Sequence, residues 1–381
     1  MRLFQAPGRA NLIGDHTDYM GGMVMPMAID RGTWLWARAR PDRVIRATSA
    51  NFPEAGVIEV DMDLDAPAAE AGWVNYLVAM VSALRKRGSD IPHGFDVLVR
   101  GSIPNGAGLS SSASLELAFG VALNEILELG VTPTELAQAG QVAENDFIGV
   151  SSGIMDQLII ALGEQGNALA MDCETLEVEA VPMPASDVVV VANSRKRRGL
   201  VDSEYNARRS AAESAERSLG VGRLVDIAPA DLDGLLERLA PELRGPARHV
   251  ATEQHRVLAA VDALRAGDRV RMGELMRQSH ESLRDDYRVT GPELDALVEA
   301  AWAAPGCVGA RMTGAGFGGC TVNLVEEAKV TDFIAAVGPE YTRRTGLEPE
   351  FFVVRSADGA QEITDPNELA ANDPAVWGVQ A

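Results

Sequence analysis

The sequence predicts a two-domain α/β (α+β) protein in which helices and strands are mixed in both halves. Its 381 residues, 46% of them hydrophobic, are enough for two hydrophobic cores. In the first half, a strand-like run at 95–99, a glycine loop and a helical pattern over 115–127 form one α/β unit. Beyond residue 185, long helical stretches and apolar runs indicate a second, α+β unit.

Apolar periodicity and turn residues predict the elements in chain order. In the first half we expect strands within 23–61 (at 34–39 and 57–60), helices over 73–87 and 133–148, and a strand over 167–171. Thr132 suits the N-cap of the second helix, and Pro133 suits its first turn. Pro182 and Pro184 then indicate a domain boundary near residue 185. In the second half we expect strands over 188–192, 306–312, 320–325 and 350–355, and helices over 203–219, 247–266 and 269–285.

Composition and charge exclude several classes of protein. A net charge of −21 would repel nucleic acid, so any phosphate site has to be a local positive spot. The three cysteines are widely spaced without a CxxC, which indicates neither a disulfide framework nor a thiolate zinc site. No secretory leader is evident, and no apolar run approaches the roughly 18 residues of a membrane span. The sequence therefore predicts a cytoplasmic protein with no nucleic-acid or membrane partner.

The loop before the helix at 115–127 has the layout of an anion-binding site, with the sequence PNGAGLSSSAS. Gly106 and Gly108 permit a tight turn, and the free N–H groups and dipole of the following helix favour a phosphate. The loop has no lysine and fails the ordinary P-loop pattern, so its hydroxyls would do part of that work. These hydroxyls belong to Ser110, Ser111 and Ser112. The alternative is a simple N-cap cluster, and the loop alone leaves both interpretations open.

A second glycine cluster, MTGAGFGGCTVNLV, contains Gly314, Gly316 and Gly319 in a formal GxGxxG pattern. A dinucleotide site needs a helix after the glycines, whereas residues 320–325 favour a strand. The chain also has no HRD or DFG to accompany a protein-kinase loop. We therefore expect a glycine turn between two strands. The pattern alone favours a tightly packed turn over a backbone lid that closes beside a phosphate or sugar.

The N-terminal stretch APGRANLIGDHTDYMGG, residues 6–22, holds many hydrogen-bonding groups between glycines. Such groups suit a hydroxyl-rich ligand, because each sugar hydroxyl both donates and accepts. They are Arg9, Asn11, Asp15, His16, Asp18 and Tyr19. One histidine and two aspartates could also bind a cation, but no second histidine lies nearby and the spacing matches no zinc signature. A cluster of turn-forming residues is the third interpretation.

Taken together, these motifs resemble those of the galactokinases of the GHMP kinase superfamily. The resemblance covers essentially the whole chain, in family order, from the N-terminal stretch through GLSSSASLE, GIMDQL, SEYNARR and SHESLRDDYRVTGPELDALVEAA to GARMTGAGFGGCTVNLV. Six collinear motifs are a specific signature, and they favour the functional interpretation of each. The resemblance implies that the γ-phosphate of ATP is transferred to the C1 hydroxyl of α-D-galactose. This reaction gives galactose 1-phosphate and ADP, the entry step of galactose metabolism by the Leloir pathway.

The resemblance also implies the catalytic and metal-binding residues. Asp156 would lie beside the C1 hydroxyl, as a base or as an orienting acceptor, and Arg9 would lie near this hydroxyl and the γ-phosphate. Ser112 and Glu144 would hold Mg²⁺. A glutamate in an amphipathic helix is more often a solvated residue, which is the alternative for Glu144.

Ligand contacts are implied in the same way. Sugar recognition is carried over to Asp15, His16, Asp18, Gly153 and Tyr205. Nucleotide binding is carried over to Trp73, Gly106, Gly108, Ser110, Ser111 and Ser112. The tryptophan would flank adenine, although core packing is the ordinary role of this residue type.

Two stretches depart from the family pattern. The family usually has GEHTDYN, whereas this chain has the shorter Asp15 at the acidic position, which reduces its reach to the 6-hydroxyl. We hypothesise that sugars altered or lacking there, such as L-arabinose, are accepted. The segment SRKRR at 194–198 carries more basic residues than usual, and a solvated loop is favoured over a patch that steers ATP.

For the fold, the family implies two domains, 1–184 and 185–364, with the active site between them and residues 365–381 packed back on the first. The first would contain a mixed sheet with a left-handed βαβ unit at the serine loop, against the usual handedness, and the second would be ferredoxin-like. We expect a monomer. Two alternatives stay open, a sensor without turnover and a superfamily kinase for mevalonate, homoserine or another sugar. Intact catalytic residues disfavour the first, and the hydroxyl-binding N-terminal motif disfavours mevalonate and homoserine.

Overall fold

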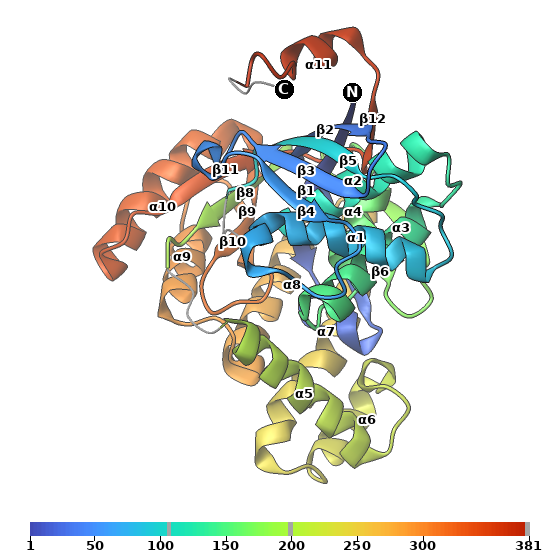
Figure 1. Ribbon diagram of the computed structural model, residues 1–381. Helices are drawn as coiled ribbons and strands as arrows, with labels where there is room; N and C mark the ends of the chain where they lie inside the picture. The colour runs from blue at the N-terminus through green and yellow to red at the C-terminus, as the bar shows by residue number, and fades with distance from the viewer. Residues whose placement is uncertain (105–107, 197–200, 378–381) are drawn as a thin grey trace.

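The computed structural model describes residues 1–104, 108–196 and 201–377, and for residues 201–203 only the backbone. Two β-sheets organise these residues (Figure 1). The larger sheet has eight strands, with the order β12-β1-β2-β5-β3-β4 and with β6 and β7 joined through β2. The smaller sheet has the order β11-β8-β10-β9. A mixed α/β fold in two units is therefore confirmed.

The larger sheet is mixed, because β3 runs parallel to β5 while its other pairs are antiparallel. Its strands are β1 (Arg2–Ile13), β2 (Met23–Ala39), β3 (Val44–Ser49), β4 (Ile58–Asp61), β5 (Phe95–Gly101), β6 (Asn167–Asp172), β7 (Val178–Pro182) and β12 (Gln361–Ile363). The N-terminal motif thus begins inside β1, which the sequence did not predict as a strand. The register of β1 against β2 shifts between Pro7 and Gly8, as expected because proline has no N–H to donate to the neighbouring strand.

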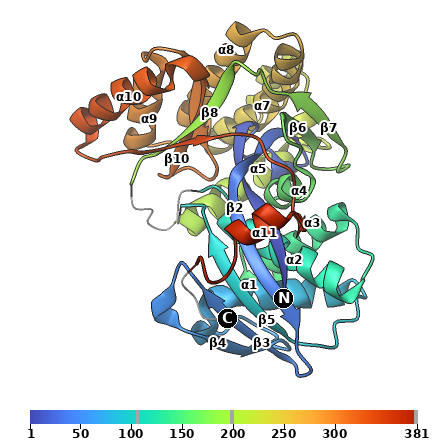
Figure 2. The same cartoon turned by 90° about the horizontal axis from the view of Figure 1, so that it is seen from above.

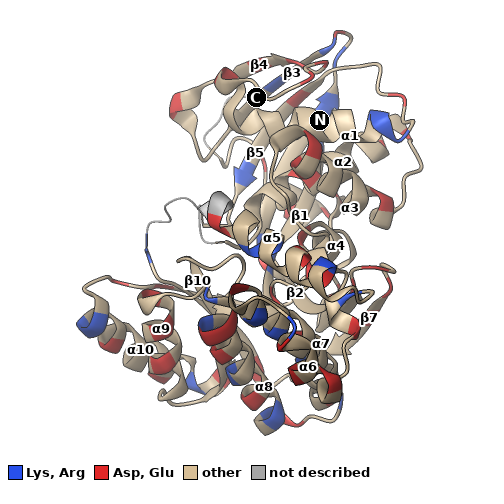
Figure 3. Cartoon of the chain, turned by 90° about the horizontal axis from the view of Figure 1, so that it is seen from below, with Lys and Arg blue, Asp and Glu red and all other residues tan. Residues whose placement is uncertain are grey.

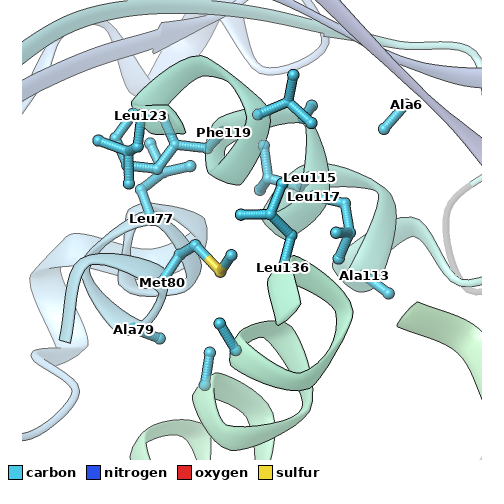
Figure 4. Packing of buried hydrophobic residues seen from close by; sticks show 14 of the residues in the cluster. Ala6, Leu77, Ala79, Met80, Ala113, Leu115, Leu117, Phe119, Leu123 and Leu136 are labelled. Carbon is cyan, nitrogen blue, oxygen red and sulfur yellow. The ribbon is translucent and has the colours of Figure 1, made fainter. Parts of the chain in front are cut away.

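Four helices pack together against this sheet: α1 (Asn75–Lys86), α2 (Ser111–Leu127), α3 (Pro133–Val142) and α4 (Met155–Leu162). Figure 4 shows Leu77 and Met80 of α1 and Leu136 of α3 facing the apolar side chains of α2. Thr132 and Glu135 form a reciprocal capping box at the start of α3, so the predicted cap is confirmed. The helix predicted over 133–148 continues beyond α3 as a π-helical turn, Ala143–Ile148.

The second sheet is antiparallel and is formed by β8 (Asp187–Asn193), β9 (Cys307–Thr313), β10 (Cys320–Glu326) and β11 (Glu350–Val354). Its helices are α5 (Val201–Leu219), α6 (Pro229–Leu236), α7 (Pro241–Arg265), α8 (Arg269–Ser282), α9 (Pro292–Trp302) and α10 (Val330–Thr345). The strand order and the antiparallel pairing give the ferredoxin-like arrangement that was expected. The sequence did not predict α6, α9 or α10.

Both faces of the second sheet are buried. Val188 and Val190 of β8 share a cluster with α9 and α10, whereas Val189 and Val191 lie in a cluster with α7 and α8. The latter cluster also contains Leu12 of β1, so one hydrophobic core joins the two sheets. Acidic and basic residues lie interspersed along the outer helices α7, α8 and α10 (Figure 3).

The chain changes sheets between Pro182 of β7 and Asp187 of β8, close to residue 185. It returns at β12, which pairs with β1, so residues 361–363 belong to the larger sheet rather than to the second unit. The short helix α11 (Pro366–Ala371) then lies close to the N-terminal end of β1 (Figure 2). The Trp36 indole donates to the Asn372 carbonyl over 2.8 Å and fixes this segment. The hand of the connection at the serine loop stays a prediction.

No helix within the described ranges is both long and apolar enough to cross a membrane.

Candidate active site

A cavity of about 370 Å³ lies where the N-terminal motif, the serine loop, the π-helical turn, α4, α5 and the β9–β10 turn meet. It brings together twelve of the fourteen residues that the family resemblance assigns to the site. They are Arg9, Asp15, His16, Asp18, Gly108, Ser110, Ser111, Ser112, Glu144, Gly153, Asp156 and Tyr205. Trp73 lines an adjoining cavity of about 230 Å³, which Ser111 and Ser112 also line. Gly106 lies outside the described residues.

Arg9 and Asp156 form a bidentate ion pair in this cavity. The Arg9 Nε and Nη2 donate to the two Asp156 carboxylate oxygens over 2.8 and 2.9 Å, and Nη1 donates to the Gly108 carbonyl over 2.6 Å. Arg9 is buried, whereas the Asp156 side chain keeps 27% of its surface exposed. The carboxylate is thus held rigidly but stays accessible from the cavity. Asp156 lies within the first turn of α4 and is not its N-cap.

Ser110 occupies the N-cap position of α2 without capping it. Its hydroxyl makes no bond to the helix and donates instead to Asp156 Oδ2. Its backbone has a φ of 60°, in the left-handed region that is uncommon for residues other than glycine. Such strain often accompanies a functional position, and it aims the hydroxyl across the cavity. A pure capping role is therefore wrong for Ser110.

Glu144 is buried, contrary to the solvated alternative, because the π-helical turn points it inward. Its Oε1 accepts from the Ser112 hydroxyl over 2.7 Å, and its Oε2 accepts from Ser152 and from the Gln157 amide. Burial raises the pKa of Glu144 above its ordinary value, while the Ser112 hydroxyl opposes this shift. A hydroxyl and a carboxylate that face each other at the cavity wall are a donor set that fits Mg²⁺.

His16 lies in an aromatic cluster with Tyr19, Tyr205 and Tyr287. Its Nδ1 is 3.0 Å from the Tyr19 hydroxyl, which is 2.6 Å from the Tyr287 hydroxyl. Burial lowers the pKa of His16 to about 3, and the neighbouring His249 contributes, so the ring is neutral. Its Nε2 is buried at the cavity and makes no well-formed hydrogen bond within the described part of the chain. A neutral imidazole with one unused nitrogen can bind a hydroxyl.

Asp18 and Gly153 fit against each other. A Cβ on Gly153 would overlap the Asp18 carboxylate, so only glycine leaves this carboxylate in its place. Burial raises the pKa of Asp18 to about 7, and the nearby charge of Asp156 adds to the shift. Burial therefore makes the ionised form of this acid costly, but near neutral pH a carboxylate that can accept from a hydroxyl is still available.

Because the folded pKa of Asp18 lies above its unfolded value, the neutral form contributes stability that is lost as the pH rises from about 4 to about 7. We expect Asp18→Asn to be more stable than the wild type at pH 8, and this advantage to shrink at pH 5. Thermal unfolding of both proteins at the two pH values measures this difference in stability. The variant Asp90→Asn, which changes an exposed carboxylate, is the control. An equal difference at pH 5 and pH 8 would refute the assignment.

A buried network behind the cavity was missed by sequence reasoning. Arg311 is fully buried and donates to Asp15 Oδ2, while the Gly314 N–H donates to Asp15 Oδ1 over 3.0 Å. Arg311 Nε donates to Ser279, whose hydroxyl donates to the buried Glu253. Glu253 in turn accepts from the backbone N–H of Gly14 over 3.0 Å. The network ties the N-terminal motif to α7, α8 and β9. An arginine in the apolar run of β9 was the one signal in the sequence.

The glycine cluster is a turn between β9 and β10, as predicted. A Cβ on Gly316 would overlap the Val289 carbonyl, which confirms tight packing. Gly314 and Ala315 also line the cavity, so the turn lies beside the ligand space as well.

The basic segment at 194–198 is partly described. Arg195 pairs with Glu350 and Lys196 pairs with Glu293, in exposed positions consistent with a solvated loop. Arg197 and Arg198 lie outside the described residues.

Comparison with known proteins identifies the family. The galactokinase galactose-binding signature matches residues 2–39, and the N-terminal and C-terminal GHMP kinase domains match residues 75–164 and 260–342. The galactokinase of Exiguobacterium sibiricum is 47% identical over 371 residues, which cover 94% of this chain and 93% of that protein. The chain belongs to the galactokinase family.

Solved structures agree with membership of the galactokinase family. The structure of Lactococcus lactis galactokinase complexed with galactose has a TM-score of 0.92 and 42% identity, and covers 95% of both chains. The mevalonate kinase of Methanococcus jannaschii has a TM-score of 0.66 at 18% identity, over 93% of this chain and 98% of that one, which shows a shared fold alone. The protein is thus a sugar kinase with the GHMP kinase fold.

Proposed function

We propose that this protein transfers the γ-phosphoryl group of ATP to the C1 hydroxyl of α-D-galactose, giving galactose 1-phosphate and ADP. The observation that carries the proposal is the Arg9–Asp156–Ser110 group at the cavity wall, between the serine loop and the N-terminal motif. Family membership and the likeness to a galactokinase complexed with galactose support the choice of sugar.

In the proposed reaction, Asp156 accepts a hydrogen bond from the C1 hydroxyl. Its bidentate pair with Arg9 and the bond from Ser110 fix the direction of the free lone pairs. Little charge develops on the nucleophile in a loose phosphoryl-transfer transition state, so orienting the hydroxyl matters as much as removing its proton. Arg9 would also offset negative charge on the transferred group, while the loop N–H groups and α2 dipole bind phosphate oxygens.

We assign the metal to Ser112 and Glu144. Mg²⁺ in a kinase neutralises charge on the β- and γ-phosphates, and it usually needs one or two protein oxygens beside phosphates and water. The opposed hydroxyl and carboxylate supply such oxygens. Trp73 in the adjoining cavity is assigned to adenine, with the nearby Phe52 and Tyr76 as further apolar wall.

Sugar recognition is assigned to Asp15, His16, Asp18, Gly153 and Tyr205. The neutral His16 offers its Nε2, which makes no well-formed hydrogen bond to the described residues. Asp18 offers a carboxylate that forms no ion pair within the described ranges, in the space that Gly153 leaves open. Tyr205 provides a ring surface 5.5 Å from the His16 ring centroid.

Asp15 bears on the choice between galactose and sugars that differ at the 6-hydroxyl. Its two oxygens already accept from Arg311 and Gly314, so only their remaining lone pairs are available to a sugar. We expect the wild type to accept L-arabinose, and Asp15→Glu to raise the ratio of kcat/KM for galactose over L-arabinose by about tenfold, the value of one hydrogen bond. Initial rates with both sugars measure the ratio. An unchanged ratio would count against this role.

The experiment that tests the function is ADP release from magnesium-ATP with a panel of sugars. The panel contains galactose, 2-deoxygalactose, galactosamine, L-arabinose, glucose and N-acetylgalactosamine. We expect turnover with galactose and much less with glucose, which differs at the 4-hydroxyl. Galactose binding without ADP release would indicate a sensor instead, and no binding would mean that the N-terminal motif recognises another sugar. We further propose that the protein is a monomer and that it is located in the cytoplasm. Light scattering measures its mass in solution and so tests the monomeric state.

A further inference from the structure

Helix α5 carries a row of three side chains that begins at the cavity. The helix packs on α7 through a buried face that includes Ala212 and Ala215. Tyr205, Arg209 and Glu213 recur every four residues, so they form a row along the side of α5 next to this face. Tyr205 lines the cavity, whereas Arg209 is not among the described residues of the cavity wall. Any effect of Arg209 on the site therefore passes through its neighbours.

The Arg209 guanidinium holds three partners at once. Its Nε donates to Glu213 one turn further along α5 over 2.8 Å, which fixes its direction. Its Nη1 donates to the Ser151 carbonyl over 2.9 Å, and its Cζ lies 5.5 Å from the centroid of the Tyr19 ring. The Arg209 side chain is 27% exposed, so these contacts are partly shielded from solvent. Because α5 belongs to the second unit and both other partners belong to the first, Arg209 joins the two units beside the cavity.

The Ser151 contact leads to Asp18. Ser151 lies in the connection between the π-helical turn and α4, and Gly153 follows it by two positions. Gly153 lies so close to the Asp18 carboxylate that a Cβ would overlap it. A displacement of the Ser151 carbonyl therefore displaces the surface against which Asp18 rests. The positive charge of Arg209 also opposes the effect of burial, which raises the pKa of Asp18 to about 7.

The Tyr19 contact leads to His16 and Tyr205. The Tyr19 hydroxyl is 3.0 Å from His16 Nδ1, and the Tyr19 ring meets the Tyr205 ring edge-on at a centroid distance of 5.6 Å. A guanidinium over the Tyr19 ring holds this ring in the orientation that both contacts require. Arg209 thus contacts the supports of three residues assigned to the sugar, and its described contacts include none of the residues assigned to the nucleotide.

We propose that Arg209 is a positioning residue for the sugar, which fastens α5 to the segment 151–153 and to Tyr19 and thereby holds the galactose-binding side of the cavity in shape. Glu213 directs the guanidinium, so that one planar group reaches both the carbonyl and the ring. The positioning role rests on the proposed binding of galactose in this cavity, whereas the fastening of the segment 151–153 does not.

Hydrogen exchange of the protein without ligands tests the fastening. We expect the peptide that covers 149–154 to exchange faster in Arg209→Met than in the wild type, because the Ser152 N–H is hydrogen-bonded in the intact segment. Arg217→Met is the matched control, since Arg217 also pairs with Glu213 on α5 but is 67% exposed. Its exchange at 149–154 should equal that of the wild type. Unchanged exchange in Arg209→Met would overturn the fastening.

Calorimetric titration tests the positioning role, with galactose and, separately, with a non-hydrolysable ATP analogue and Mg²⁺. We expect Arg209→Met to weaken galactose binding by about tenfold, the usual effect of losing a hydrogen bond to a charged group, and to leave the nucleotide affinity within about twofold. Arg209→Lys keeps the charge, but its ammonium lacks the planar fork, so its loss of galactose affinity should be smaller.

Unchanged galactose affinity in Arg209→Met would overturn the positioning role, and so would equal losses for galactose and nucleotide, which indicate general destabilisation. If Arg209→Met does not fold, Arg209→Lys decides by the same comparison. No galactose binding by the wild type would refute the proposed function and this role with it, while hydrogen exchange would still decide the fastening.

Discussion

Replacing Asp156 by asparagine is expected to lower kcat by about 10²- to 10⁴-fold, the usual contribution of a positioned acid–base group. The side chain keeps its size and can still accept through one oxygen, but it loses the charge that pairs with Arg9. The binding of galactose depends on other residues, so its dissociation constant should change little. Steady-state rates and calorimetric titration with galactose measure the two quantities separately.

Ser110→Ala is the matched control for this prediction. It removes one hydrogen bond to Asp156 Oδ2 and leaves the ion pair with Arg9 intact. The kcat of Ser110→Ala should therefore lie between the kcat of the wild type and that of Asp156→Asn. If Asp156→Asn retains kcat within about tenfold, Asp156 neither activates nor orients the hydroxyl, and the proposed mechanism is wrong.

Replacing Arg311 by methionine should have the largest effect on stability. Arg311 is fully buried, its partner Asp15 is 2% exposed, and removal of one member leaves the other as an unpaired charge. Such a loss typically lowers the free energy of unfolding by about 3–5 kcal/mol. Urea denaturation of the wild type and the variant measures it.

Two further variants separate the effect of the unpaired charge at Asp15 from the effect of losing the arginine side chain itself. Arg271→Met removes an exposed arginine that pairs with Glu274 on the same helix, and it should cost less than about 1 kcal/mol. The double variant with Asp15→Asn and Arg311→Met leaves no unpaired charge, so its loss should be smaller than the sum of the single losses. Additive losses, or a loss for Arg311→Met as small as that of Arg271→Met, would contradict the proposed burial of charge.

The elements that the sequence predicted correctly are those whose signals lie in adjacent residues. The strand, glycine loop and α2 are adjacent in the chain. Alternating apolar residues predicted the strand, the glycines predicted the loop, and apolar residues at helical spacing predicted the helix. The cap at Thr132 also depended only on neighbouring residues. The second glycine cluster was predicted as a turn because a strand follows it.

The partners within the site could not be predicted from local patterns. Arg9 and Asp156 lie 147 positions apart, and Asp15 and Arg311 lie 296 apart, so only the folded chain brings them together. Family resemblance supplied Arg9 and Asp156 as members of one site, but it did not supply their bidentate geometry. The burial of Glu144 depends on a π-helical turn, for which helical periodicity has no signal.

Product analysis by phosphorus NMR tests the central claim most directly. The wild type, Asp156→Asn and Ser110→Ala are each incubated with magnesium-ATP and galactose, and the position of the phosphate is read from its coupling to the sugar protons. We predict α-galactose 1-phosphate from the wild type, less from Ser110→Ala, and almost none from Asp156→Asn. Phosphate on another carbon, or equal product from Asp156→Asn, would contradict the account.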